Sequence, residues 1–191
     1  MSSNVNILGF AGSLRAKSLN KLLLRTAVQA AEAEGASVTT IDLADYPMPV
    51  YDGDLEAKIG LPENVEKLKA LFMSHNGLLI AAPEYNSSIT AALKNMIDWV
   101  SRKNGALDLS GYQGKTAGLI AAGGGFGGLR GLAHVRQILG NIGVLVIPEQ
   151  AVVPHARDAF DDRGNLKDLG IRSAVENIGT TLAQTLAKLH G

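Results

Sequence analysis

The chain has 191 residues, of which 46% are hydrophobic and 19% charged, a composition that excludes a disordered or fibrous protein. Basic and acidic residues cancel to a net charge of zero, so no overall field favours nucleic acid or a membrane surface. The absence of cysteine excludes disulfides and thiolate chemistry, and the four histidines show no metal-ligand spacing. With no signal-peptide pattern and no apolar run near the ~20 residues of a membrane span, we expect one cytoplasmic domain over residues 1–191.

Residues 6–20, NILGFAGSLRAKSLN, combine an apolar run, a small-residue loop and the start of a helix. The polar side chains around that helix start are Ser13, Arg15, Ser18 and Asn20. Free N–H groups and the positive end of the helix dipole favour an anion there, and Arg15 adds a charge. The loop therefore predicts a phosphate site. The alternative is an ordinary strand-to-helix connection with Ser18 or Asn20 as N-cap.

Strands and helices alternate along the rest of the chain. The apolar patterns predict strands over 5–10, 38–43, 77–82, 116–122 and 144–147, and helices over 19–31, 65–72, 93–100, 132–139 and 171–189. The proline-containing segment 44–62 predicts a long irregular loop, whose Tyr51, Asp52 and Asp54 either cover a ligand or simply pack. This alternation predicts a flavodoxin-like α/β fold, a doubly wound five-stranded parallel sheet of order 2-1-3-4-5 with helices on both faces.

In that strand order the ligand crevice lies between the first and third strands, beyond their carboxyl ends. The loops that meet there are 9–19 and 83–88. The second begins with Pro83, Glu84, Tyr85 and Asn86, a rigid turn that frees backbone groups to face a flat heteroaromatic ring. For Glu84 the alternative is a partly solvated carboxylate at a loop tip. For Trp99, on the helix that follows, we favour core or subunit packing over ligand contact.

Three segments resemble one family in order and spacing: GSLRAKSLN at 12–20, PEYNSSITAALKNMIDW at 83–99, and the glycine-rich loop after the fourth strand. They are similar to the NADPH-dependent FMN reductases, particularly the quinone- and chromate-reducing branch. The resemblance implies bound FMN, with its phosphate on the loop that contains Gly12, Ser13, Arg15, Ser18 and Asn20. It also implies that the ring lies against Pro83, Glu84, Tyr85 and Asn86, with its far side near Gly123 and Gly124.

The resemblance further implies hydride transfer from NADPH or NADH through FMN to a quinone or a similar small acceptor, such as a flavin, chromate or an azo compound. The flavin carries that chemistry, so no side chain is expected as an obligatory acid or base. A homodimer or homotetramer is also implied, and we expect the apolar helix face with Met96 and Trp99 to contribute. Arg130 and Glu149, expected after consecutive strands, pair either across subunits or within the chain.

Two alternatives compete with this interpretation. A flavodoxin-type electron carrier would bind FMN without turning over NAD(P)H, but such carriers resemble acidic proteins with a Thr-rich phosphate loop. In addition, Gly123, Gly125 and Gly128 spell G-x-G-x-x-G, with Glu149 about 20 residues further at the expected end of the next strand. We interpret this segment as a flavin-edge loop, because the dinucleotide fingerprint belongs to the first βα unit of its fold.

Overall fold

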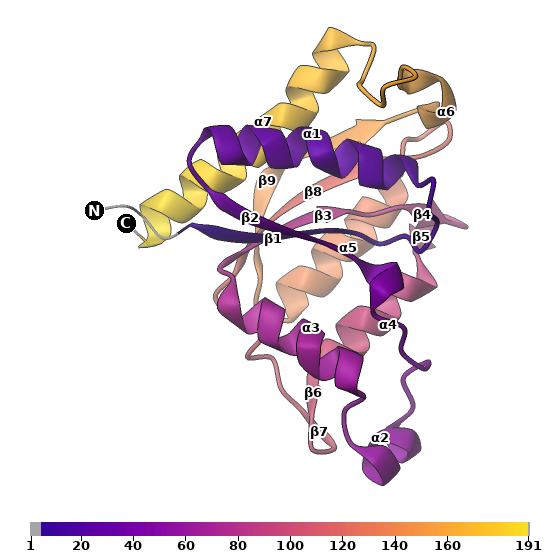
Figure 1. Ribbon diagram of the computed structural model, residues 1–191, viewed down its shortest axis with the longest axis vertical. Coiled ribbons are helices and arrows are strands. Elements are labelled where there is room, and N and C mark those ends of the chain that lie inside the picture. Colours follow the sequence, from indigo (N-terminus) through magenta and orange to yellow (C-terminus); the bar gives the residue numbers. More distant parts are fainter. Residues whose placement is uncertain (1–4, 191) are drawn as a thin grey trace.

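The computed structural model describes residues 5–190 and contains a central sheet of five parallel strands in the order β2-β1-β3-β8-β9 (Figure 1). The strands are β1 (Asn6–Ala11), β2 (Ser37–Asp42), β3 (Gly77–Ala81), β8 (Thr116–Ala122) and β9 (Leu145–Val153). If only these five strands are numbered, from the first to the fifth along the chain, their order in the sheet is 2-1-3-4-5. The predicted topology is therefore confirmed.

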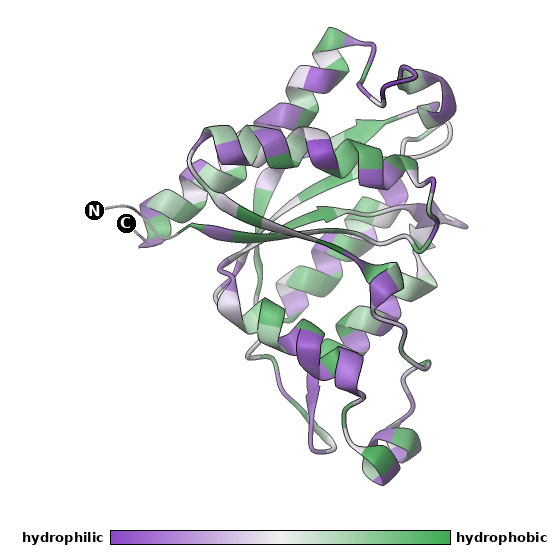
Figure 2. Cartoon of the chain, in the orientation of Figure 1, coloured by the Kyte–Doolittle hydropathy of each residue, from purple (hydrophilic) through white to green (hydrophobic). Residues whose placement is uncertain are grey.

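Helices cover both faces of this sheet (Figure 1). One face carries α1 (Leu19–Ala33) and α7 (Leu169–His190), and the other carries α3 (Glu63–Ser74), α4 (Ala91–Val100) and α5 (Leu129–Asn141). Every residue of β3 and β8 is buried, as expected for central parallel strands covered on both sides. Figure 2 shows the same pattern as hydrophobic strands between helices of mixed hydropathy.

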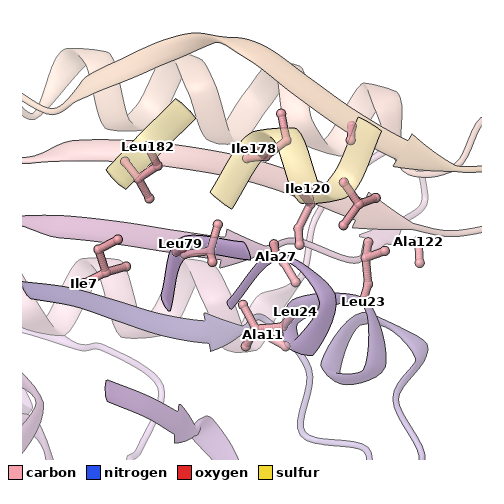
Figure 3. Close-up of a cluster of buried hydrophobic side chains, with 14 of the residues drawn as sticks. Ile7, Ala11, Leu23, Leu24, Ala27, Leu79, Ile120, Ala122, Ile178 and Leu182 are labelled. Carbon is pink, nitrogen blue, oxygen red and sulfur yellow. The ribbon is translucent and has the colours of Figure 1, made fainter. Parts of the chain in front are cut away.

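The face beneath α1 and α7 shows how closely the layers pack. Leu23 and Ala27 of α1 lie in one buried cluster with Ile120 of β8 and Ile178 of α7 (Figure 3). A Cβ on Gly179 of α7 would lie 2.0 Å from the Ala27 carbonyl oxygen, so only glycine permits this approach. The contact fixes α1, whose N-terminus faces the expected crevice.

The segment 44–62 is more ordered than predicted. It contains a 3-10 turn, η1 (Leu43–Asp45), and a short helix, α2 (Gly53–Ile59), with Asp52 as N-cap accepting from the N–H groups of Asp54 and Leu55. The buried Glu56 carboxylate accepts from Gly105 N–H at 2.9 Å and Arg102 Nε at 3.1 Å. Helix α2 is held by this polar anchor and has no apolar stripe. The hydrophobic periodicity of the sequence therefore did not predict it.

Two short hairpins complete this part of the chain. The first pairs β4 (Glu84–Tyr85) with β5 (Ser88–Ile89), and the second pairs β6 (Arg102–Lys103) with β7 (Ala106–Leu107). Tyr51 packs edge-on against Trp99 with ring centroids 5.0 Å apart. The packing alternative for Tyr51 is thus the one that the structure shows.

The last strand, β9, continues to Val153, beyond its predicted end at Ile147. Its pairing with β8 shifts, since Ala117 lies opposite Val146 but Leu119 lies opposite Gln150. Pro148 cannot donate to the ladder and falls in this irregularity, which an edge strand tolerates. After β9 comes a single helical turn, α6 (Ala156–Ala159).

Across residues 5–190 no helix combines the length and the apolar character needed to cross a membrane. The same residues contain no group of three or more His, Cys, Asp or Glu side chains placed to hold a metal ion.

Candidate cofactor site

A cavity of about 410 Å³ lies at the carboxyl ends of the central strands. It joins four loops that are distant in the sequence, which follow β1, β3, β8 and β9. Its lining residues are Ser13, Arg15, Ser18, Leu19, Asn20, Pro83, Glu84, Tyr85, Ala122, Gly123, Gly124, His155, Ala156, Arg157 and Asp158. All the predicted site residues line this cavity except Gly12 and Asn86.

The loop after β1 presents hydrogen-bond donors to the cavity. Ser18 holds the N-cap position of α1, yet its side chain makes no capping hydrogen bond. The N–H groups of Lys21 and Leu22 donate to the Ser18 carbonyl at 3.1 and 3.3 Å, so the preceding helix amides have no intrahelical acceptor. The exposed Arg15 guanidinium has no ion pair within residues 5–190. The alternative of a simple Ser18 cap is not what the structure shows.

Asn20 uses its side chain within the protein. Its amide donates to the Ala122 carbonyl at 2.8 Å and accepts from the Ala122 N–H at 2.9 Å. Asn20 is 4% exposed, so both bonds are shielded from water. Asn20 therefore anchors the start of α1 to the end of β8. Because the side chain is used in this way, a phosphate contact of Asn20 stays a prediction for the backbone N–H only.

Gly12 lies beneath the loop rather than in the cavity. Its N–H donates to the Ala81 carbonyl at 2.9 Å, and its carbonyl accepts from Thr90 Oγ1 at 2.6 Å. A Cβ at this position would lie 2.9 Å from Leu93. Gly12 thus allows the loop to pack closely on α4.

The loop after β3 turns out to be a hairpin. Asn86 and Ser87 form its turn with φ values of 50° and 64°, the left-handed conformation that tight hairpins favour. Asn86 is thereby carried to the tip of the hairpin and does not line the cavity. Glu84 Oε2 accepts from the Gly131 N–H of α5 at 2.9 Å, so its carboxylate is bonded near a helix N-terminus rather than held free at a loop tip.

The glycine-rich loop and the segment after β9 form one continuous wall. The carbonyls of Gly123 and Gly124 accept from the N–H groups of Ala156 and His155 at 2.9 and 3.0 Å. A Cβ on Gly124 would meet nothing within 4 Å, so this part of the wall is open to a ligand.

Sequence reasoning missed the four residues from His155 to Asp158, because β9 was expected to end early. The apolar run of residues 151–153, followed by Pro154, was the available signal for a strand that reaches the crevice edge.

The position of Glu149 does not match the dinucleotide fingerprint, which needs an acidic residue at the end of the next strand. Glu149 lies within β9, four residues before Val153, which pairs with Ala122 at the cavity edge. At ~3.3 Å per residue, Glu149 is about 13 Å from that edge. The expectation that Glu149 follows the strand end is therefore wrong, and the interpretation of 123–128 as a different kind of loop is favoured.

Arg130 has partners within its own chain. Its Nη1 donates to Ser87 Oγ at 2.8 Å, and its guanidinium lies 4.0 Å from the centroid of the Phe126 ring. It thus links the glycine-rich loop to the β4–β5 hairpin. Of the two arrangements left open for Arg130, the structure shows the intrachain one.

The helix face expected at a subunit interface is instead part of the core. Met96 is 1% exposed and Trp99 is fully buried, and Trp99 Nε1 donates to the Pro49 carbonyl at 2.8 Å. Core packing is thus confirmed for Trp99. The expectation that these two side chains form a subunit contact is wrong.

A parallel sheet in this order, with an anion-ready first loop at the point where the winding reverses, defines the flavodoxin-like class of α/β proteins. A sequence model of the family described as NADPH-dependent FMN reductase matches residues 5–158. The chain belongs to this family.

Named relatives agree with this assignment. The NAD(P)H-dependent FMN reductase of Pseudomonas aeruginosa is 33% identical over 193 residues, covering 100% of both chains. The NADPH:quinone oxidoreductase of Arabidopsis thaliana is 31% identical and covers 98% of this chain and 94% of its own length. Among solved structures, the flavoenzyme NAD(P)H:(acceptor) oxidoreductase FerB of Paracoccus denitrificans superimposes with a TM-score of 0.77 at 26% identity, covering 98% of this chain and 99% of its own.

Proposed function

We propose that this chain binds FMN in the 410 Å³ cavity and transfers hydride from NADPH or NADH to quinones or similar small acceptors. The observation that carries the proposal is the meeting of two loops, 13–20 and 83–85, in a single cavity. One loop offers donors without protein partners, and the other offers a rigid turn and an aromatic ring. The family assignment and the named reductases support this reading over a flavodoxin-type carrier.

The residues present fit a flavin mononucleotide. Ser13, Ser18 and the first amides of α1 can donate to a phosphate, and the Arg15 guanidinium can add a charge-assisted bond. At the other end of the cavity, Pro83 to Tyr85 and the open backbone at Gly124 can hold the flat ring between them, with Gly123 beside it. Asn86 joins this set only if the hairpin tip moves, so its predicted ring contact is the weakest of the group.

The protein's part in the reaction is binding and orientation. Bound FMN supplies the hydride chemistry. The Glu84 carboxylate is occupied by the Gly131 N–H, which fixes the hairpin beside the cavity, and Arg130 ties the same hairpin to the glycine-rich loop. We assign no side chain as an obligatory acid or base.

Because the two loops meet in one cavity, we expect nicotinamide and acceptor to use the flavin in turn, so that one half-reaction ends before the other begins. Initial rates measured against NADPH at several quinone concentrations should then give parallel double-reciprocal lines. Intersecting lines would contradict this order of events. They would indicate a complex containing both substrates and a separate nucleotide site at 123–128.

We also propose a homodimer or homotetramer in the cytoplasm. Support for assembly comes from three exposed apolar side chains on the β4–β5 hairpin, the glycine-rich loop and the start of α5, because Tyr85, Phe126 and Leu129 are 55%, 61% and 45% exposed. A chain without cysteine suits a reducing compartment. Light scattering of the FMN-loaded protein should give at least twice the monomer mass, and a monomer at working concentration would contradict the assembly.

A further inference from the structure

The cavity contains a second arginine. Arg157 lies on α6 and lines the same cavity as the loop after β1. It is exposed, and its side chain has no hydrogen bond or ion pair with any residue in 5–190. Its guanidinium carries five N–H donors in a planar fork. The fold therefore holds a second unpaired cation in the same cavity as Arg15.

The anchoring of α6 places Arg157 on the phosphate side of the cavity. Ala156 is buried in the core cluster that contains Leu23 of α1 and Ala122 of β8, and its N–H donates to the Gly123 carbonyl. Asn20 joins the start of α1 to the same Ala122. Figure 1 shows α6 on the side of the sheet that carries α1 and α7.

The remaining charges do not neutralise this side. Asp158 and Glu84 are the carboxylates that line the cavity, and Glu84 is bonded to the Gly131 N–H of α5, which packs on the other face of the sheet. Asp158 lies on α6 with Arg157, so the α1 side of the cavity combines Arg15, Arg157 and the positive end of α1 with one carboxylate. An arginine fork left unpaired in such a place matches a phosphate group.

We infer that Arg157 binds a phosphate monoester together with Arg15. The inference rests on the proposed function, which offers two sources of that group: the 5′-phosphate of FMN and the 2′-phosphate of NADPH. The chemistry is the same in both cases, namely a dianion held by a guanidinium. The inference adds Arg157 to the phosphate site predicted from the loop after β1, which contains only residues 12–20.

The test compares Arg157→Ala and Arg157→Lys with the wild type and with Arg163→Ala. Arg163 is an exposed arginine of the same segment that does not line the cavity. Dissociation constants are measured for FMN and for riboflavin, which lacks the phosphate, and kcat/KM is measured for NADPH and NADH on FMN-saturated protein. Melting temperatures check that each variant folds.

If FMN supplies the phosphate, Arg157→Ala should weaken FMN binding by about tenfold or more and leave riboflavin binding unchanged. If NADPH supplies it, kcat/KM should fall by a similar factor for NADPH and not for NADH. Arg157→Lys should lose less than Arg157→Ala in either case, since it keeps the charge but not the fork.

Arg157→Ala values that match those of Arg163→Ala in all four measurements would overturn the inference. Wild-type protein that binds neither flavin would instead overturn the proposed function, so the two failures can be told apart.

Discussion

The two ends of the central sheet carry cavities of similar size and opposite character. The cavity at the carboxyl ends has about 410 Å³, and one at the amino ends has about 370 Å³. Both have polar lining residues, and at the amino ends these include Ser74, His75, Asn76, Lys115 and His190. Size and the presence of polar residues alone would therefore not distinguish a binding site from a structural gap.

The difference lies in whether the polar groups already have partners. At the amino ends, Lys115 Nζ donates to the His75 carbonyl, Asn76 Oδ1 accepts from Asn6 N–H at 3.0 Å, and the His75 ring contacts Thr39 Oγ1 at 2.8 Å. Moreover, α3 and α7 end there, and the negative ends of their dipoles disfavour an anion. At the carboxyl ends α1 begins, and Ser18, Arg15 and Arg157 retain unused bonding capacity.

The largest expected effect is on cofactor affinity at the carboxyl ends. Arg15→Ala and Ser13→Ala should each weaken FMN binding by ~10- to 150-fold, because each removes about 1.5–3 kcal/mol of charge-assisted phosphate contact. Fluorescence titration of the apoprotein with FMN measures this. Lys115→Met, at the other cavity, is the matched control and should bind FMN as the wild type does. Equal affinities in all these variants would refute the contrast between the two cavities.

Asn20 lies at the carboxyl ends of the strands, but its side chain already has partners, like the polar groups at the amino ends. Asn20→Leu should lower the free energy of unfolding by roughly 2 kcal/mol, since it leaves both backbone groups of Ala122 without their buried partner. Urea denaturation of the apoprotein measures this cost. An unchanged unfolding midpoint would mean that the Asn20–Ala122 pair does not hold the start of α1 in place.

A smaller effect of opposite sign is expected at the start of β8. Thr116 is 1% exposed, and its Oγ1 has no hydrogen-bond partner within residues 5–190. Thr116→Val keeps the shape and removes the unsatisfied hydroxyl, so it should stabilise the chain by about 1 kcal/mol without changing FMN affinity. The unfolding midpoint in urea is the readout. Destabilisation would show that the hydroxyl has a partner after all.

The smallest effect concerns the pH dependence of stability. Burial lowers the pKa of Lys115 below its ordinary value of 10.5. Between the folded and unfolded pKa values the unfolded chain binds more protons, so the free energy of unfolding rises with pH across that window. Lys115→Met should lack this rise. Urea titrations from neutral pH to pH 10.5 compare the two proteins, and parallel curves would contradict the assignment.

The sequence was sufficient for the sheet order and for most of the cavity, for a physical reason. Buried parallel strands such as β3 and β8 are continuous apolar runs, and the loops that follow them must meet at one edge. What it could not show were structures held by single polar contacts. Helix α2 depends on the buried Glu56, and the β4–β5 turn depends on the left-handed conformation of Asn86 and Ser87.

The segment from His155 to Asp158 was missed for a related reason. Pro148 interrupts the apolar pattern of β9, and only the shifted pairing with β8 shows that the strand continues to the cavity. The same shift separates Glu149 from the glycine-rich loop. Spacing alone predicted that Glu149 lies at the end of its strand. That prediction was wrong because β9 is an irregular edge strand that continues to Val153.

We propose that NADPH or NADH would reduce FMN held in the carboxyl-end cavity before any acceptor binds. The most direct measurement is anaerobic titration of the FMN-loaded protein with NADPH, followed in the visible spectrum. We predict that one equivalent of NADPH bleaches one equivalent of flavin without acceptor, and that added quinone restores the oxidised spectrum. Flavin that stays oxidised under NADPH until quinone is present would contradict the account.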